Sequence, residues 1–228
     1  AKNYANVYDS TLNHINIMNE ELSVSTELGQ DSGKVLTTKR IPSKTSFYVP
    51  HDVQGLAKLM GGRDSLECTL DSLFFKDEYA SYDHIPFLYN YTKAPYKTQL
   101  AVNKIRIAYT GEVAGLTGDV AQSAWFVFAS LGFYPVDPVS NQYILTTPMF
   151  KEANIRIGNR KWISLSVIGN PETDIYIQSV KLNGNNYQKG FITYEQLING
   201  AEIEFTLGPE PNPGWASAEE NQPISGLD

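Results

Sequence analysis

The spacing of apolar residues changes once along the chain, and this change constrains the fold more than any other feature. Between about residues 50 and 132 the apolar side chains recur at helical spacing, and after Pro135 and Pro138 they alternate at every second residue. A helix buries a stripe of its surface, whereas a strand buries alternate side chains. The sequence therefore predicts an α+β protein in which helices come first and strands follow.

Four helices are predicted in the first half of the chain. Gly61 and Gly62 follow the first, Pro95 precedes the third, and Gly132 follows the fourth, which are ordinary helix-boundary residues. The fourth is apolar nearly all round, so we expect it to be deeply buried. The predicted helices cover residues 52–60, 64–75, 96–109 and 119–131.

The second half predicts an antiparallel sheet, as in a small β-sandwich, with one short helical turn at 194–199. Residues 1–9 are expected to be helical, and residues 11–45 to be a loop with short pieces of structure. The predicted strands cover residues 154–157, 162–168, 175–182 and 201–207. The chain is thereby divided into a mainly helical part at 1–150, an antiparallel β region at 151–208 and a Pro-rich tail at 209–228, which is expected to be extended or mobile.

Composition excludes several classes of function. The chain has 25 acidic and 18 basic residues, a net charge of −7 and no Lys/Arg cluster, which argues against a nucleic-acid partner. No apolar stretch is long enough to span a membrane. The single cysteine, Cys68, allows no internal disulfide and is predicted to be a small buried side chain. One cysteine and three scattered histidines also exclude a Cys/His zinc site.

Four runs of residues carry a resemblance to a known family. They are Tyr-Val-Pro-His-Asp-Val-Gln-Gly-Leu at 48–56 with Leu-Met-Gly-Gly at 59–62, His-Ile-Pro-Phe-Leu-Tyr-Asn-Tyr at 84–91 with Ala-Pro-Tyr-Lys-Thr-Gln at 94–99, Gln-Ser-Ala-Trp-Phe-Val-Phe at 122–128 with Leu-Gly-Phe-Tyr-Pro at 131–135, and Ile-Tyr-Ile-Gln-Ser-Val-Lys-Leu-Asn-Gly at 175–184. In this order and spacing, residues 45–208 resemble the C-terminal part of glycoside hydrolase family 92.

That family contains exo-acting, calcium-dependent, inverting α-mannosidases. The resemblance implies the closing helices of an (α/α)6-type barrel followed by an antiparallel β-sandwich or sheet region. It also implies a periplasmic, cell-surface or secreted location. A partial barrel would expose apolar helix faces. Either another polypeptide or chain segment completes the barrel, or the chain has been remodelled into its own fold, or the sequence is part of a longer molecule.

Inverting glycosidases use two carboxyl groups, one as acid and one as base. The resemblance places Lys39 where the family has its acid, and Glu27 could take that place only with a sizeable insertion. With a one-residue deletion after Gln122, Asp119 matches the base and Gly118 its companion. Asp119 also suits a helix N-cap, so both roles are open for this residue.

The resemblance also implies a Ca²⁺ cofactor. The family's calcium-binding run aligns with residues 78–84, where His84 is retained. Tyr79, Ala80 and Asp83 stand where the family has Asn, Glu and His. Calcium takes six or more oxygen ligands, so the loss of an amide and a carboxylate from this run should weaken calcium binding severely. No residue of this chain is therefore identified as a metal ligand.

Five residues match positions near the sugar site in the family: His51, Asp52, His84, Tyr96 and Lys97. His51 and Asp52 could line that site, or Asp52 could cap a helix and His51 could be a buried, hydrogen-bonded ring. Tyr96 belongs to a run that approaches the site in the family, and its alternative role is packing. Outside this set, Trp125 and Tyr134 are assigned to the core.

The resemblance implies two main alternatives for the function, and the first has a glycan as its binding partner. One is an α-mannosidase-like protein that acts on or binds mannose-containing glycans. The alternative is a catalytically inactive carbohydrate-binding or structural surface-assembly protein on the same scaffold. A third possibility is a β-rich interaction module whose helical half is covered by another chain.

Overall fold

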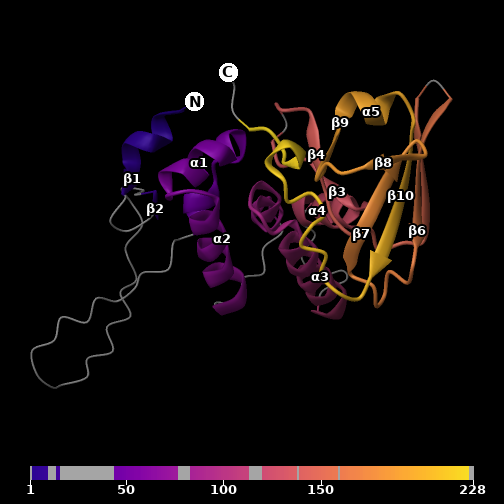
Figure 1. The fold of residues 1–228 in the computed structure, drawn as a ribbon, viewed down its shortest axis with the longest axis horizontal. Coiled ribbons are helices and arrows are strands. Elements are labelled where there is room, and N and C mark those ends of the chain that lie inside the picture. Colours follow the sequence, from indigo (N-terminus) through magenta and orange to yellow (C-terminus); the bar gives the residue numbers. More distant parts are fainter. Residues whose placement is uncertain are drawn as a thin grey trace, which may run out of the picture.

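The structure is a computed structural model that describes residues 2–9, 14–15, 44–76, 83–112, 120–137, 139–158 and 160–225. Helices and strands are mixed, which confirms the α+β class. None of the described helices has the length and apolarity needed to cross a membrane. Figure 1 shows α1 and α2 at one end, the larger sheet at the other, and α3 and α4 between them.

The first half is helical, as predicted. The glycines after the first helix, Gly61 and Gly62, have φ of 95° and 114°, and Gly132 after the last has 89°, which explains why the helices stop there. The elements are η1 (Lys2–Val7), the short pair β1 (Tyr8–Asp9) and β2 (His14–Ile15), η2 (Lys44–Phe47), η3 (Pro50–Asp52), α1 (Val53–Leu59), α2 (Arg63–Asp71), the π-helical turn η4 (Ser72–Lys76), η5 (Ile85–Tyr91), α3 (Pro95–Glu112) and α4 (Val120–Leu131).

The second half contains two sheets. A three-stranded sheet has the order β3 (Phe133–Tyr134), β4 (Gln142–Leu145), β9 (Phe191–Thr193). A five-stranded sheet has the order β5 (Glu152–Ile157), β6 (Lys161–Ile168), β10 (Ala201–Gly208), β7 (Tyr176–Leu182), β8 (Asn185–Tyr187). The short helix α5 (Tyr194–Ile198) confirms the predicted turn, and η6 (Glu219–Asn221) lies in the C-terminal segment.

The prediction of a wholly antiparallel sheet is wrong at one pair. Strand β10 lies between β6 and β7, antiparallel to β7 but parallel to β6, with Ala201 opposite Ile163. Alternation along a strand shows which side chains are buried, but it does not show which strand is its neighbour. The order therefore had to come from the structure.

Two hydrophobic cores divide the molecule. The first lies among the helices and includes Phe47, Leu56, Leu66 and Trp125. The second contains inward side chains of both sheets, among them Leu145, Leu165, Ile192 and Phe205. Helix α4 contributes to both, because Trp125 belongs to the first and the partly buried Phe128 packs against the second.

Two expectations about burial are wrong. Helix α4 buries Trp125 and Ala129, but Val120 is 81% exposed and Val127 is 56% exposed, so the helix has an open face. Cys68 is exposed as well. Its helix, α2, buries Leu66, Thr69 and Leu70, and Cys68 lies outside that stripe.

The Pro-rich tail is packed as far as residue 225, contrary to the expectation that it is extended or mobile. Trp215 and Ala216 are buried in the second core. The side-chain amide of Gln222 donates to the carbonyl oxygen of Thr92 and accepts from Arg63. The tail thus binds the helical half to the sheets.

Asn90 makes a second connection between the halves. It is buried in η5, and its amide donates to the carbonyl oxygens of Leu145 and Gly190 at 3.2 and 2.9 Å. The triplet from Asn90 to Thr92 has the form of a glycosylation sequon, but in this fold its asparagine is inaccessible.

Candidate functional site

Segments far apart in the sequence meet at Asp83 and His84. The ring Nε2 of His84 lies 2.7 Å from the carbonyl oxygen of Phe47, and because a carbonyl only accepts, Nε2 carries the proton. The indole N–H of Trp125 donates to the carbonyl oxygen of Asp83 at 2.8 Å. Residues from η2, from the start of η5 and from α4 are therefore fixed together.

The carboxylate of Asp83 is held on both of its oxygens. Oδ1 accepts from the backbone N–H of Ile85 at 2.9 Å, and Oδ2 accepts from the hydroxyl of Tyr48 at 3.2 Å. Tyr48 is 53% exposed and lies edge-on to the ring of His84, with centroids 5.1 Å apart. Tyr48 and Asp83 are thus an ordered polar pair that reaches the surface beside a buried histidine.

Burial and charge shift the titration of this cluster. Burial lowers the pKa of His84, and this outweighs the hydrogen bond to Phe47 and the charge of Asp83, both of which raise it. Partial burial raises the pKa of Tyr48, and the negative charge of Asp83 adds to the rise. At neutral pH the cluster therefore presents a neutral imidazole and a protonated phenol.

Aromatic rings support the cluster from behind. Tyr134 stacks on Phe87 at 4.4 Å with an interplanar angle of 8°, and Phe87 meets Trp125 at 6.2 Å. Burial, followed by the charges of Asp83 and Tyr48, raises the pKa of Tyr134 to about 12. The assignment of Trp125 to the core is confirmed, and Tyr134 packs against that core while partly exposed.

His51 and Asp52 lie at the start of α1. Asp52 caps the helix, because its Oδ1 accepts from the N–H of Gly55 at 3.0 Å, and its Oδ2 accepts from the hydroxyl of Tyr4 at 2.7 Å. A Cβ on Gly55 would collide with this carboxylate. His51 is half-buried and edge-on to the ring of Tyr4 at 5.8 Å. The N-cap role weighed for Asp52 is therefore confirmed.

Tyr96 and Lys97 lie on α3 and face other partners. The ammonium of Lys97 is 2.7 Å from both Glu67 Oε1 and Asp71 Oδ2 on α2. Burial lowers the pKa of Lys97, but the bonds to the two carboxylates outweigh it and the pKa is raised. The hydroxyl of Tyr89 also donates to Asp71, at 3.0 Å. This ion-pair network joins α2 and α3, and Tyr89 connects it to η5, the helix that follows Asp83. Tyr96, beside Lys97 in the sequence, is half-buried.

Several predicted residues lie outside the part of the chain that the structure describes. They include Lys39, which stands at the family's acid position, the possible acid Glu27, and the proposed base with its companion. They also include most of the run aligned with the family's calcium ligands. The residues are Glu27, Lys39, Glu78, Tyr79, Ala80, Gly118 and Asp119.

The described residues do not fit a calcium ion. No group of three or more His, Cys, Asp or Glu side chains among them could hold a metal. At Asp83 both carboxylate oxygens already accept hydrogen bonds, and the adjacent His84 binds a backbone carbonyl. A calcium shell needs six or more oxygen ligands. The described residues alone therefore do not supply a complete calcium shell.

A comparison of sequences identifies the family. Residues 1–209 match the glycosyl hydrolase family 92 catalytic domain. The chain belongs to glycosyl hydrolase family 92. Family 92 membership explains why the runs at 48–56, 84–91 and 122–128, which the sequence alone relates to that family, converge on one cluster.

Individual family relatives agree. An "uncharacterized secreted glycosidase" of Arthroderma benhamiae is 29% identical over 195 residues, covering 80% of this chain and 25% of that protein. A family GH92 α-mannosidase of Bacteroides thetaiotaomicron is similar with a TM-score of 0.70 and 30% identity, covering 79% of this chain and 26% of the other. A GH92 inverting mannosidase of the same bacterium has a TM-score of 0.71 and 28% identity, with coverages of 78% and 28%. The chain spans about a quarter of these relatives.

Sequence reasoning missed part of the cluster. Tyr48 and the carbonyl of Phe47 were not candidates, and Asp83 was considered only as a replacement within the calcium run. Each is adjacent to a matched residue, since Tyr48 begins the first run and Asp83 precedes His84. Adjacency to two separate runs was therefore the signal that could have found them.

Proposed function

We propose that this chain recognises mannose-containing glycans as the C-terminal region of an α-mannosidase-like family 92 protein. The observation that carries the proposal is the exposed Tyr48 hydroxyl held on Asp83, where three family-92 runs meet. The α-mannosidase and the inverting mannosidase among the structural relatives supply the substrate class.

The cluster has the chemistry to bind a sugar. The hydroxyl of Tyr48 donates a hydrogen bond to Asp83, so the lone pairs of its oxygen can accept a hydrogen bond from a sugar hydroxyl. The exposed ring of Tyr48 offers an apolar face to the C–H side of a sugar ring. We place these two residues in the sugar-binding wall.

The other predicted site residues take different places in this proposal. The cap made by Asp52 and the ion pairs of Lys97 support structural roles, in which these residues hold the first turn of α1 and the α2–α3 contact. We also place His51, three residues after Tyr48 in the sequence, beside this wall, and propose Tyr96 as a sugar contact separate from it. Asp119 is proposed as the base, with calcium held by ligands outside the described residues.

The proposal includes a covering for the helical half. Val120 and Val127 lie seven residues apart on α4, on one face of the helix, and both are exposed. Another polypeptide or chain segment that completes an (α/α) barrel would bury this face, and the chain is only about a quarter as long as its relatives. A secreted location accords with the description of the fungal relative.

The test is to measure the binding of α-linked mannobiose by calorimetry or by NMR titration. Tyr48→Phe removes one hydroxyl and should weaken binding about threefold to tenfold, as loss of one hydrogen bond does. Tyr194→Phe is the matched control, because Tyr194 is 47% exposed but lies on α5. A folded chain that does not bind mannobiose, or equal effects of the two substitutions, would contradict the proposal.

A second function is favoured by one observation: Tyr79, Ala80 and Asp83 stand where the family's calcium-binding run has Asn, Glu and His. It is a catalytically inactive carbohydrate-binding or structural surface protein. Mannobiose hydrolysis measured with calcium and with a chelator separates the two functions. Turnover abolished by the chelator supports the α-mannosidase, whereas binding without turnover in either condition supports the inactive protein.

A further inference from the structure

We propose that the outer face of the five-stranded sheet is a second carbohydrate-binding surface, with Trp162 as its stacking platform. The ligand class is a neutral hexose polymer. This surface lies on β5, β6 and β10, at the opposite end of the molecule from α1 and α2, so it does not depend on the wall at Tyr48 (Figure 1).

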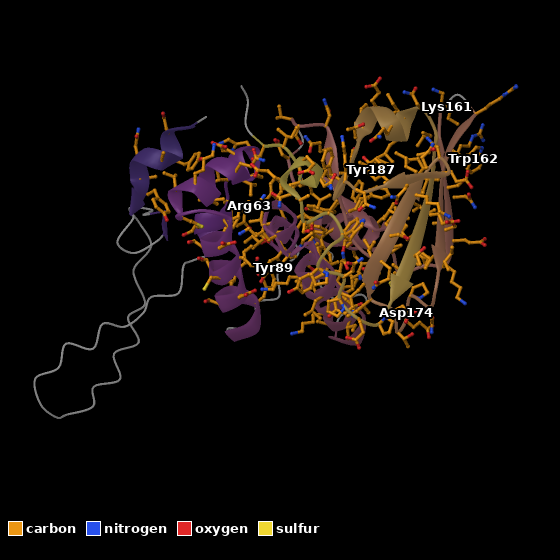
Figure 2. The ribbon with its side chains drawn as sticks, viewed as in Figure 1. Arg63, Tyr89, Lys161, Trp162, Asp174 and Tyr187 are labelled. Atoms are coloured by element: carbon orange, nitrogen blue, oxygen red, sulfur yellow. The ribbon has the colours of Figure 1, made fainter. Side chains whose placement is uncertain are left out.

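Trp162 stands on the solvent side of the sheet. Its neighbours Ile163 and Leu165 are 5% and 4% exposed and point into the second core, so Trp162 and Ser164 point away from it. Trp162 is 49% exposed, whereas the other two tryptophans, Trp125 and Trp215, are 1% and 2% exposed. Figure 2 shows Trp162 at the side of the sheet farther from the helices.

The neighbouring strands place different residues beside Trp162. Gly200 precedes β10 with a φ of 88°, and a Cβ placed on it would lie 3.4 Å from the carbonyl oxygen of Trp162. The position next to Trp162 on that side thus carries no side chain. On the other side Arg156 of β5 is directly opposite Trp162 in the ladder. Trp162 is therefore flanked by an arginine on one neighbouring strand and by a glycine on the other side.

A row of polar side chains lies beside the platform, on the same outward face of the sheet. Asn154 is opposite Ser164 on one side, and Glu202 is opposite Ser164 on the other, so amide, hydroxyl and carboxylate groups form a row across three strands. A hexose has an apolar C–H face that packs on an aromatic ring and hydroxyls around its edge that need donors and acceptors. Trp162 would take the first and this row the second.

The charges on the face favour a neutral ligand over a nucleic acid or a polyanion. Lys181 is paired with Glu204 at 2.8 Å, which cancels both charges locally. Arg156 then stands with Glu202 and Glu152 on the same face, so no cationic patch is formed. Hydroxyl-rich, uncharged polymers are the class that such a surface accepts without a buried unpaired charge.

The tryptophan distribution gives a direct measurement. Because Trp125 and Trp215 are buried, quenching of intrinsic fluorescence by iodide reports on Trp162. Soluble α-mannan and a neutral glucan such as dextran are the probes. At least one should reduce iodide quenching in the full chain and equally in Tyr48→Phe, because the two surfaces are separate. Absence of shielding by both polymers overturns the proposal.

Affinity electrophoresis in gels containing the same polymers then tests the stacking role. Trp162→Ala should weaken retention about tenfold and Trp162→Tyr much less, since tyrosine keeps a ring. Ile168→Ala is the matched control, because Ile168 is 52% exposed on the same face of β6 but is not aromatic. Equal losses in Trp162→Ala and Ile168→Ala overturn the stacking platform. Shielding that grows with protein concentration in the absence of sugar makes this face a contact between two copies and also overturns it.

Discussion

The indole N–H of Trp125 donates a hydrogen bond to the backbone carbonyl of Asp83 over 2.8 Å, and so ties α4 to the segment that precedes η5. Trp125 is 1% exposed, so its N–H has no access to water as a substitute partner. The position of the Asp83 carboxylate, and with it that of Tyr48, therefore depends on a side chain buried in the helical core.

Trp125→Phe should destabilise the chain more than Trp215→Phe does. Both residues are buried, but Nε1 of Trp215 has no hydrogen-bond partner among the described residues, so its loss removes packing alone. Loss of the bond to Asp83 should add about 1–2 kcal/mol to the cost at Trp125. Denaturant unfolding of the two variants gives the difference, and equal costs would show that the bond to Asp83 contributes nothing.

Lys97→Met should lower the free energy of unfolding by about 1–3 kcal/mol, because it leaves Glu67 and Asp71 without their cation. The matched substitution is Lys93→Met. Lys93 pairs with Asp64 at 2.8 Å, but the two side chains are 57% and 76% exposed, and an exposed pair is worth at most about 0.5–1 kcal/mol. Thermal or urea unfolding measures the loss of stability in each variant. Equal losses would show that the α2–α3 network contributes no more than an exposed ion pair.

The chain should lose stability in mild acid through His84. Burial lowers the pKa of this histidine below its ordinary 6.5, so the unfolded chain binds a proton more readily than the folded one. The contribution is fully present above about pH 6.5 and is lost as pH falls toward the folded pKa. In His84→Gln the free energy of unfolding should decline less steeply between about pH 7 and pH 5. Parallel pH profiles for the two proteins would refute the assignment.

Gly55→Ala should destabilise α1, although alanine is usually better than glycine inside a helix by about 1 kcal/mol. The added methyl group would collide with the Asp52 carboxylate and displace the cap, which is worth about 1 kcal/mol. The control is the same substitution in Asp52→Ala, where the collision is gone and Gly55→Ala should be neutral or stabilising. Urea denaturation of the unchanged chain, the two single variants and the double variant gives the four free energies of unfolding. If Gly55→Ala still destabilises the chain when Asp52 is absent, another contact causes the loss.

The sequence predicts local structure better than tertiary structure. The helix ends at Gly61 and Gly132 and the short helix at 194–198 all follow from local backbone preferences, and the structure has each of them. The Pro-rich tail shows the limit. Its composition suggests an unpacked segment, but Trp215 is buried in the second core, a fact that depends on partners distant in the sequence.

The candidate site shows the same division. The family runs indicate that residues 48–56 and 84–91 lie near a sugar site, but they do not predict which side chains of the two runs are in contact. The hydrogen bond from Tyr48 to Asp83 joins residues 35 positions apart, and nothing in either run specifies it. Asp52 could be predicted as a cap because its partner, Gly55, is three residues away.

The place of β10 in the larger sheet sets an order of assembly. The hairpins β5–β6 and β7–β8 close locally, but β6 and β7 share only one neighbour, which is the strand at Ala201–Gly208. During synthesis the five-stranded sheet therefore cannot be completed until this segment has left the ribosome, and until then the two hairpins stay unconnected. Until then each keeps an open hydrogen-bonding edge, which is the kind of surface that chaperones bind and that misfolded chains use to associate. A substitution that weakens β10 should therefore reduce the yield of folded protein in the cell more than its effect on equilibrium stability suggests.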